Sequence, residues 1–264
     1  MVKFGDQGDE VKKLQTLLKT FGYLEGKIDG IFGTLTDLAV KKVEAYLRIP
    51  KDGVVDASIW AHLNNLLDTE NSAKYWFPFA TKAGTIKTSW KYPKDWPEGA
   101  IIHFTVSSNA SSPLETLKRD NFPCLVIDKD GTLYQPFPIN EGGPHCGTKE
   151  HRTCIGIELV SAGLVTKVET KFKTAFNSFL LESDVRYVHK QDNMKEGWYE
   201  KYTRAQESTL LRVLLWLKAE EPSIFDLNKV KGHDEVAPLR KSDPGGSLSM
   251  SMLEYRSFLN KQWG

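Results

Sequence analysis

The spacing of apolar residues changes once along this chain, and that change limits what it can fold into. As far as residue 66, apolar side chains recur every three or four positions, which is typical of amphipathic helices. After a polar run that begins at Asp68, short β-branched segments alternate with helical ones. A chain of 264 residues is also long for one compact domain. We therefore predict a small all-α domain at 1–67, a linker at 68–76 and an α/β domain at 77–264.

The first domain should contain three helices joined by two similar turns. Helical spacing of apolar residues covers 9–21, 34–49 and a shorter stretch at 59–63. The segments 29–36 and 52–59 each offer Asp-Gly for a tight turn, an apolar pair for the core, and Thr or Ser to cap the next helix. This pattern predicts a three-helix module.

In the second domain, β-branched segments alternate with amphipathic ones. Strands are expected at 100–106, 124–127, 132–136 and 154–160, and the clearest helix at 203–219. Such a mixture predicts an α/β domain with a central mixed sheet flanked by helices.

The charges of the chain nearly cancel, because 35 Lys and Arg residues against 34 Asp and Glu residues give a formal net charge of +1. No overall field therefore favours DNA, RNA or an anionic membrane. The first residues contain no apolar segment of the signal-peptide kind, and no other stretch is long and apolar enough to span a bilayer. We expect a monomer without stable membrane association that stays in the cytoplasm until another factor releases it.

The three cysteines, Cys124, Cys146 and Cys154, cannot all pair within the chain. Their spacing fits no four-ligand zinc site. We expect three free thiols, as in a reducing compartment, with Cys146 and Cys154 near the functional site.

A motif spans the first two predicted helices. Its parts are Gly5-Asp6-x-Gly8-x-x-Val11-x-x-Leu14-Gln15, Gly22-Tyr23 and Asp29-Gly30-x-Phe32-Gly33-x-x-Thr36. In this pattern, residues 1–67 resemble the peptidoglycan-binding domain family. The resemblance implies binding to bacterial peptidoglycan through Gln15, Tyr23, Asp29, Phe32 and Thr36. Val43-Glu44 stands where relatives often have Phe-Gln, and Asp56 replaces a common glycine.

A histidine in strand 100–106 becomes informative when it is considered with a distant loop. Strand alternation points Ile101, His103 and Thr105 to one face, where a single histidine would be an ordinary core residue. Loop 232–245, Gly-His-x-x-x-Ala-Pro-x-Arg-Lys-x-Asp-Pro-Gly, adds His, Lys and Asp among turn-forming residues. With Ile-His-Phe-Thr of the strand, this loop makes the second domain similar to the zinc-dependent N-acetylmuramoyl-L-alanine amidases. That type is shared by bacterial amidases, phage endolysins and peptidoglycan recognition proteins.

The resemblance implies that His103, His233 and Asp243 bind Zn²⁺. Two imidazoles and one carboxylate leave one position of a tetrahedral zinc open for water. Zinc lowers the pKa of such a water toward about 7, so that hydroxide becomes available to attack an amide carbonyl near neutral pH. The implied substrate bond joins N-acetylmuramic acid to L-alanine of the stem peptide.

Glu158 is the predicted general base and acid. Alternation in strand 154–160 places its side chain on the opposite face from Ile157 and Leu159. Burial of a carboxylate costs free energy, so its presence in an apolar strand indicates a structural or functional role. The strand resembles the family's catalytic glutamate strand; a structural acceptor at the sheet edge is the alternative.

Lys241 lies two residues before Asp243, on the same side of an extended backbone, and could stabilise the oxyanion of a tetrahedral intermediate. A solvated loop lysine is the alternative. His145, in a stretch that resembles the family's groove-lining His-x-Gly, and Thr105 are expected to bind substrate, although His145 could be a surface-loop histidine. Many relatives carry a Tyr-His pair where this chain has Pro123-Cys124, so the chemistry must depend on Glu158, Lys241 and the metal.

Other classes of protein fit less well. No Gly-x-Ser-x-Gly elbow is present for a serine hydrolase. A Cys-His enzyme built on His145 and Cys146 is disfavoured, because nucleophile and base must converge in space and sequence neighbours rarely do. A non-catalytic peptidoglycan receptor and a bacterial autolysin or wall-recycling amidase stay open beside the favoured phage endolysin. The remaining histidines are expected to be structural or exposed: His62, His151 and His189.

Overall fold

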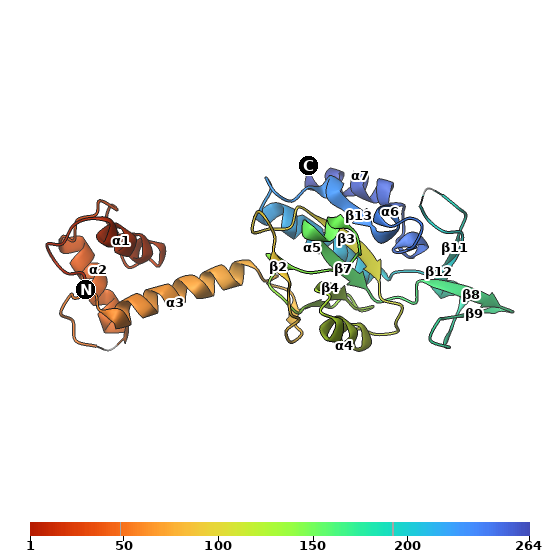
Figure 1. Cartoon of the computed structure of the whole chain (residues 1–264), viewed down its shortest axis with the longest axis horizontal. Coiled ribbons are helices and arrows are strands. Elements are labelled where there is room, and N and C mark those ends of the chain that lie inside the picture. The colour runs from red at the N-terminus through yellow and green to blue at the C-terminus, as the bar shows by residue number, and fades with distance from the viewer. Residues whose placement is uncertain (48, 192) are drawn as a thin grey trace. The chain divides into compact units, whose positions relative to one another are not determined.

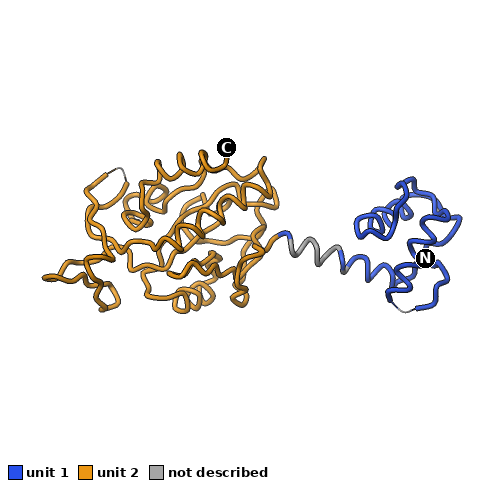
Figure 2. Tube along the Cα trace, turned by 180° about the vertical axis from the view of Figure 1, so that it is seen from behind, with its two compact units in different colours: residues 1–74 blue, residues 75–264 orange. Residues whose placement is uncertain are grey.

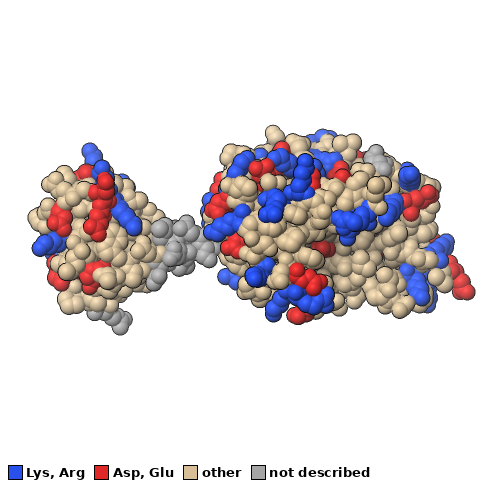
Figure 3. Space-filling model, in the orientation of Figure 1, with Lys and Arg blue, Asp and Glu red and all other residues tan. Residues whose placement is uncertain are grey.

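Two compact units, residues 1–74 and 75–264, make up the chain (Figure 2). The structure is a computed structural model that describes residues 1–47, 49–191 and 193–264, with the side chains at 65 and 67–73 left aside. On the face seen in Figure 3, Lys and Arg are interspersed with Asp and Glu, in keeping with a net charge of +1. No helix within these described ranges combines the length and apolarity needed to cross a bilayer.

The first unit contains three helices, α1 (Asp9–Thr20), α2 (Thr34–Leu47) and α3 (Ala57–Lys74) (Figure 1). Helix α1 turns its apolar positions inward, as the spacing predicts, whereas α2 buries Val40 and Val43 but leaves Leu35 and Leu38 exposed. Their shared core includes Leu14, Leu18, Val40, Val43, Ile59 and Leu63, with Phe32 inserted from the loop before α2.

Helix α3 differs from its prediction. The sequence predicts a short third helix followed by a linker at 68–76, but α3 has 18 residues and continues to Lys74. Between Ala57 and Lys74 the chain contains neither glycine nor proline, so no residue ends the helix locally. A polar composition was therefore a poor indicator of helix termination.

A six-stranded mixed sheet forms the centre of the second unit. Its order is β1-β5-β4-β7-β3-β13; β4 and β5 are antiparallel, and the other neighbours are parallel. The strands are β1 (Thr81–Lys82), β3 (Gly99–Phe104), β4 (Cys124–Ile127), β5 (Leu133–Gln135), β7 (Cys154–Leu159) and β13 (Val230–Gly232).

Helices cover both faces of this sheet (Figure 1). On one face, α5 (Arg204–Glu220) and α7 (Met252–Trp263) pack on Ile102, Leu125 and Ile157. On the other face, α4 (Ser111–Asp120) packs on Val126. The predicted fold class, a three-helix domain followed by an α/β domain with a central mixed sheet, is confirmed.

A second, antiparallel sheet was not predicted from the sequence. Its order is β10-β9-β8-β12-β11, and it lies between β7 and α5 in the chain. The strands are β8 (Leu164–Val168), β9 (Lys171–Lys173), β10 (Phe179–Leu180), β11 (Val185–Val188) and β12 (Gly197–Glu200); β2 (Trp90–Lys91) pairs separately with β6 (Glu141–Gly142). The remaining elements are short: helix α6 (His233–Val236) and 3₁₀ turns at Lys149–Arg152, Glu182–Asp184, Leu227–Lys229 and Gly245–Ser247.

Candidate active site

Three predicted metal ligands meet at one end of the central sheet. Strands β3 and β13 are parallel neighbours, with Gly232 in register with Ile102, so His103 and His233 emerge side by side. Their Nδ1 atoms are 2.8 Å apart, and Oδ2 of Asp243 lies 3.1 Å from Nδ1 of His103 and 2.8 Å from Nδ1 of His233. All three side chains are buried.

The Nε2 atoms of His103 and His233 form hydrogen bonds with groups outside the cluster. Nε2 of His233 lies 2.9 Å from the carbonyl oxygen of Cys146, which can only accept a hydrogen bond. Nε2 of His145 likewise donates to the carbonyl of Cys154 at 2.9 Å, so Nδ1 of His145 is left to accept from Nε2 of His103 at 3.2 Å. In their neutral forms, His103 and His233 therefore carry the proton on Nε2 and turn the lone pair of Nδ1 toward Asp243.

This arrangement fits a metal. Two nitrogen lone pairs and a carboxylate oxygen, all within 3.1 Å of one another, would repel unless a cation or proton lay among them. Burial works against the charge of Asp243, but a proton on Nδ1 of a histidine would outweigh burial and hold the pKa of Asp243 below its usual range; a metal ion would take the place of that proton. Burial also lowers the pKa of His103, which favours the neutral, ligating imidazole. Two nitrogens with one carboxylate oxygen are a donor set that suits zinc.

Glu158 lies beside the cluster. It is in register with His103 on the neighbouring strand β7, while Ile157 and Leu159 point into the core on the opposite face. Its Oε2 atom is enclosed and has no hydrogen-bond partner among the residues that the structure describes. Burial raises the pKa of Glu158 to about 8; the charge of Asp243 adds to this rise and that of Lys241 opposes it. The position thus provides a carboxyl group that can bind and release a proton near neutral pH.

A cleft of about 540 Å³ opens over these residues. All seven candidate residues of the second domain line it: His103, Thr105, His145, Glu158, His233, Lys241 and Asp243. Sequence reasoning gave no role to several others that line it, including Val106, Phe122 and Arg240. Arg240 and Lys241 stand next to each other in the resembling motif, a signal that could have indicated a cationic wall.

His145 contacts the cluster more closely than a substrate-binding residue needs to. Both of its ring nitrogens are occupied, one by His103 and the other by the carbonyl of Cys154. A side chain at Gly156 would collide with this ring and with the thiol of Cys124. The alternative Cys-His pair is not formed, since the thiol of Cys146 contacts Oγ1 of Thr148 at 3.2 Å.

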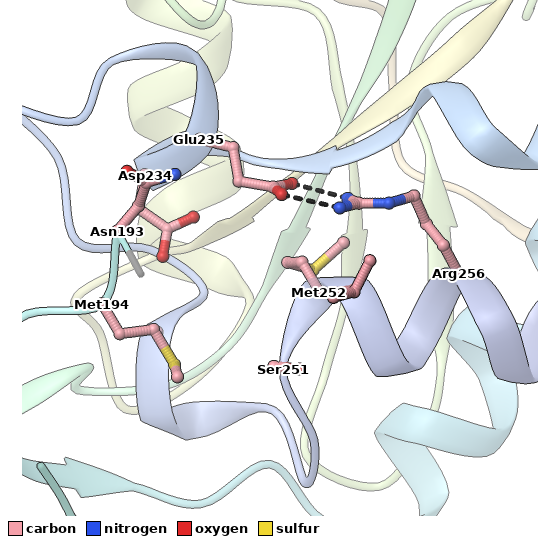
Figure 4. Close-up of a pocket in the computed structure, with 9 residues that line it drawn as sticks. Asn193, Met194, Asp234, Glu235, Ser251, Met252 and Arg256 are labelled. Carbon is pink, nitrogen blue, oxygen red and sulfur yellow. Dashed lines mark hydrogen bonds and ion pairs between the residues drawn. The ribbon is translucent and has the colours of Figure 1, made fainter. Parts of the chain in front are cut away.

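Contacts with helix α7 hold the loop that carries His233 and Asp243. A second pocket, of about 270 Å³, lies between this loop and α7 and is lined by Glu235 and Arg256 (Figure 4). The carboxylate of Glu235 accepts two hydrogen bonds from Arg256, at 2.7 and 2.8 Å, and a third from the backbone of Gly232 at 2.9 Å. The N–H of Asp234 donates to the carbonyl of Asp243 at 2.8 Å. These contacts fix the two ligands of the loop relative to α7 and to each other.

The five candidate wall-binding residues of the first unit are mostly internal. Gln15 donates to Asp29, Ile31 and Thr36 and accepts from the N–H of Gly30 at 2.8 Å. Gln15, Phe32 and Thr36 are buried, whereas Asp29 is exposed and Tyr23 half-buried. The motif therefore holds the turn before α2, and direct contact with a partner is open to Asp29 and Tyr23.

The remaining histidines and the thiols match their expected environments. The ring of His62 makes a tilted contact with Tyr46, and that of His151 with Trp90, whereas His189 is exposed. The lining of the cleft, within the ranges that the structure describes, includes none of these three. Cys124, Cys146 and Cys154 are buried free thiols.

Known proteins are similar to both units. The sequence model of a putative peptidoglycan binding domain matches residues 7–63, and that of N-acetylmuramoyl-L-alanine amidase matches residues 93–246. An uncharacterized protein in the bpoA1 3′ region of Kitasatospora aureofaciens is 37% identical over 65 residues, which are 24% of this chain; the chain spans about half of that protein, 55%.

Solved structures also match. A selenomethionine AmpD derivative is 20% identical, with 70% of this chain and 96% of that one covered and a TM-score of 0.45. The amidase LysC from Clostridium intestinale URNW is 20% identical, with 70% and 99% covered and a TM-score of 0.43. The SleB N-terminal domain is 32% identical, with 25% and 89% covered and a TM-score of 0.24. Because the amidase model matches more than half of the chain, this protein belongs to the N-acetylmuramoyl-L-alanine amidase family and carries a peptidoglycan-binding domain ahead of its amidase domain.

Proposed function

We propose that this protein is a zinc-dependent amidase of bacterial peptidoglycan. It hydrolyses the amide between the lactyl group of N-acetylmuramic acid and L-alanine of the stem peptide. The observation that carries this proposal is the convergence of two Nδ1 atoms and one carboxylate oxygen, from His103, His233 and Asp243. Glu158 lies beside them, with its Oε2 atom unpartnered in the described part of the chain.

The residues of the cleft divide the reaction among them. Zinc, when bound by the three ligands, supplies Lewis acidity and lowers the pKa of a water molecule toward about 7. Glu158 accepts a proton from the attacking water and passes it to the nitrogen of the leaving amine as the C–N bond breaks. Lys241 offsets the negative charge that develops on the carbonyl oxygen. The products are a lactyl carboxylate and the free amine of L-alanine.

His145 acts on the metal site through His103 rather than through the substrate. Its hydrogen bond keeps the proton of His103 on Nε2 and the ring in a fixed orientation. Thr105 lines the cleft next to this ligand and is the candidate for direct substrate contact.

The first unit tethers the enzyme to its polymer. A module that holds the wall raises the effective concentration of the cleft at the wall without any new contact in the active site. Asp29 and Tyr23 are the residues of the motif whose exposure permits such contact.

We infer a phage endolysin role, in which a monomeric enzyme waits in the host cytoplasm until the membrane is permeabilised. A bacterial autolysin or recycling amidase would use the same chemistry. Holin-like genes beside the coding sequence would support the endolysin role, and a wall-remodelling gene cluster would contradict it.

Metal analysis combined with digestion of purified cell walls tests the function. We expect about one zinc per chain, loss of turbidity-reducing activity with a chelator, and its return with added Zn²⁺. Mass spectrometry of the digest should find stem peptides with a free L-alanine amine. A zinc-free protein that binds walls without cutting them would instead establish the receptor alternative, and cleaved glycosidic or cross-bridge bonds would reject the amidase assignment.

A further inference from the structure

The lining of the active-site cleft combines cationic and apolar side chains. Arg240 and Lys241 are cationic, and the guanidinium of Arg240 also donates to the carbonyl of Cys146 at 2.6 Å. Opposite in chemical character are Val106 and Phe122, whose exposed fractions are 45% and 40%. Large apolar side chains that are exposed in a cleft are typical of a site that binds apolar groups of a ligand.

Val106 has a backbone conformation that valine rarely adopts. Its φ angle is +54°, in the left-handed region that favours glycine and asparagine. Strand alternation from the sequence would place Val106 with Ile102 on the core side, but β3 ends at Phe104 and the left-handed turn redirects the side chain to the cleft.

Hydrogen bonds on both sides of Val106 hold this conformation. The N–H of Thr105 donates to the carbonyl of Leu159 at 3.1 Å, and that of Ser107 donates to the carbonyl of Ser161 at 3.2 Å. Oγ1 of Thr105 accepts from the N–H of Ser161 at 3.3 Å and contacts Oγ of Ser107 at 2.7 Å. The flanking residues are thus fixed to the chain that follows β7, and the strain at Val106 cannot relax locally.

We propose that Val106 is a specificity-determining residue that contacts the methyl-bearing part of the substrate next to the scissile amide. This inference rests on the proposed function. In the proposed substrate the scissile amide lies between two methyl groups, one on the lactyl group and one on L-alanine, and carboxylates begin only with the next residue of the stem peptide. Apolar lining residues would contact the methyl groups, and the cationic Arg240 and Lys241 would attract the carboxylates of the peptide.

The experiment separates the side chain of Val106 from its backbone strain. Val106→Asn and Val106→Gly relieve the left-handed strain and remove the branched methyl groups, whereas Val106→Ala removes the methyl groups alone. The control is Val168→Asn, at an equally exposed valine (42%) on β8, away from the cleft lining. The zinc-loaded full chain is assayed with N-acetylmuramoyl-L-alanyl-D-isoglutamine and with its analogue that has glycine in place of L-alanine.

We expect Val106→Asn to keep or raise the melting temperature while KM for the alanine substrate rises about tenfold and kcat changes little. The preference of the wild type for alanine over glycine, about tenfold for one methyl group, should fall toward one in all three variants. Unchanged KM and preference in Val106→Asn, or a similar change in Val168→Asn, would overturn the inference. If the wild type cleaves neither substrate nor purified walls, the proposed function itself fails.

Discussion

His103 and Glu158 occupy paired positions on the adjacent parallel strands β3 and β7. His103 turns a nitrogen lone pair toward His233 and Asp243, and Glu158 has a carboxyl oxygen, Oε2, without a hydrogen-bond partner among the described residues. Because both are strand residues, sheet register rather than a loop sets their separation. If Glu158 is the general base and His103 a metal ligand, as we propose, Glu158 needs no loop movement to reach its position.

Replacement of one metal ligand should separate cutting from binding. In Asp243→Ala the carboxylate that opposes two nitrogen lone pairs is lost, so we expect zinc content and wall lysis to fall below detection. Binding to intact walls through residues 1–74 should persist in a pull-down assay. Asp130→Ala, at an exposed turn, serves as the control and should keep its zinc. Retained zinc in Asp243→Ala would contradict the ligand assignment.

The two roles considered for His145 predict different measurements. If His145 orients His103, then His145→Phe should weaken zinc binding by about 10- to 100-fold in a competition titration with a chelating dye. If it binds substrate instead, zinc affinity should be unchanged and KM should rise. His189→Phe, at an exposed histidine, should change neither quantity.

Glu158 should make the metal-free protein less stable as the pH rises. Its raised pKa of about 8 means that, above the ordinary carboxyl value of about 4.3, the folded chain keeps a proton that the unfolded chain releases. The stabilisation present at low pH is therefore lost as the pH rises through this window.

Glu158→Gln keeps the neutral form at every pH. In urea unfolding with a chelator, its free energy of unfolding should exceed that of the wild type by on the order of a few kcal/mol at about pH 8.5 and by almost nothing near pH 4. Glu169→Gln, at an exposed turn, controls for the loss of a charge. A difference that is equal at both pH values would show that burial does not perturb Glu158.

Gln15 should support folding of the first unit rather than its contact with the wall. Gln15→Leu leaves the N–H of Gly30 and the hydroxyl of Thr36 without their partner, which should cost about 1–3 kcal/mol and speed hydrogen exchange in α1. Tyr23→Ala should lower wall binding while exchange in α1 stays unchanged. The opposite pattern would return Gln15 to the binding surface.

Much of the fold follows from local patterns. Helical spacing predicted α1 and α2, and β-branched runs predicted β4 and β7 at or close to their observed bounds. The second antiparallel sheet escaped prediction because its strands are short and are flanked by charged residues, so their alternation of burial gives a weak signal. Helix α3 was too short in the prediction because polarity, unlike glycine or proline, does not stop a helix.

The candidate site was likewise predictable from the sequence only in part. The resemblance of two motifs to a known family implied metal-binding roles for His103, His233 and Asp243 and strengthened the roles predicted for Glu158 and Lys241, and those roles stay predictions that the geometry supports. A sequence motif indicated that Gln15 and Thr36 are functional residues, but tertiary packing buries both of them around the turn before α2.

The sequence by itself determined the two-domain plan, the helical and strand segments, and the residue types available for metal binding, because these depend on neighbours a few positions apart. Only the tertiary structure decided that His145 contacts His103 across 42 positions of sequence and that Val106, beyond the end of β3, lines the cleft. Such contacts arise where β3, β7 and the chain after β7 come together. The residues next to a side chain in the sequence do not determine which distant group will form a hydrogen bond with it.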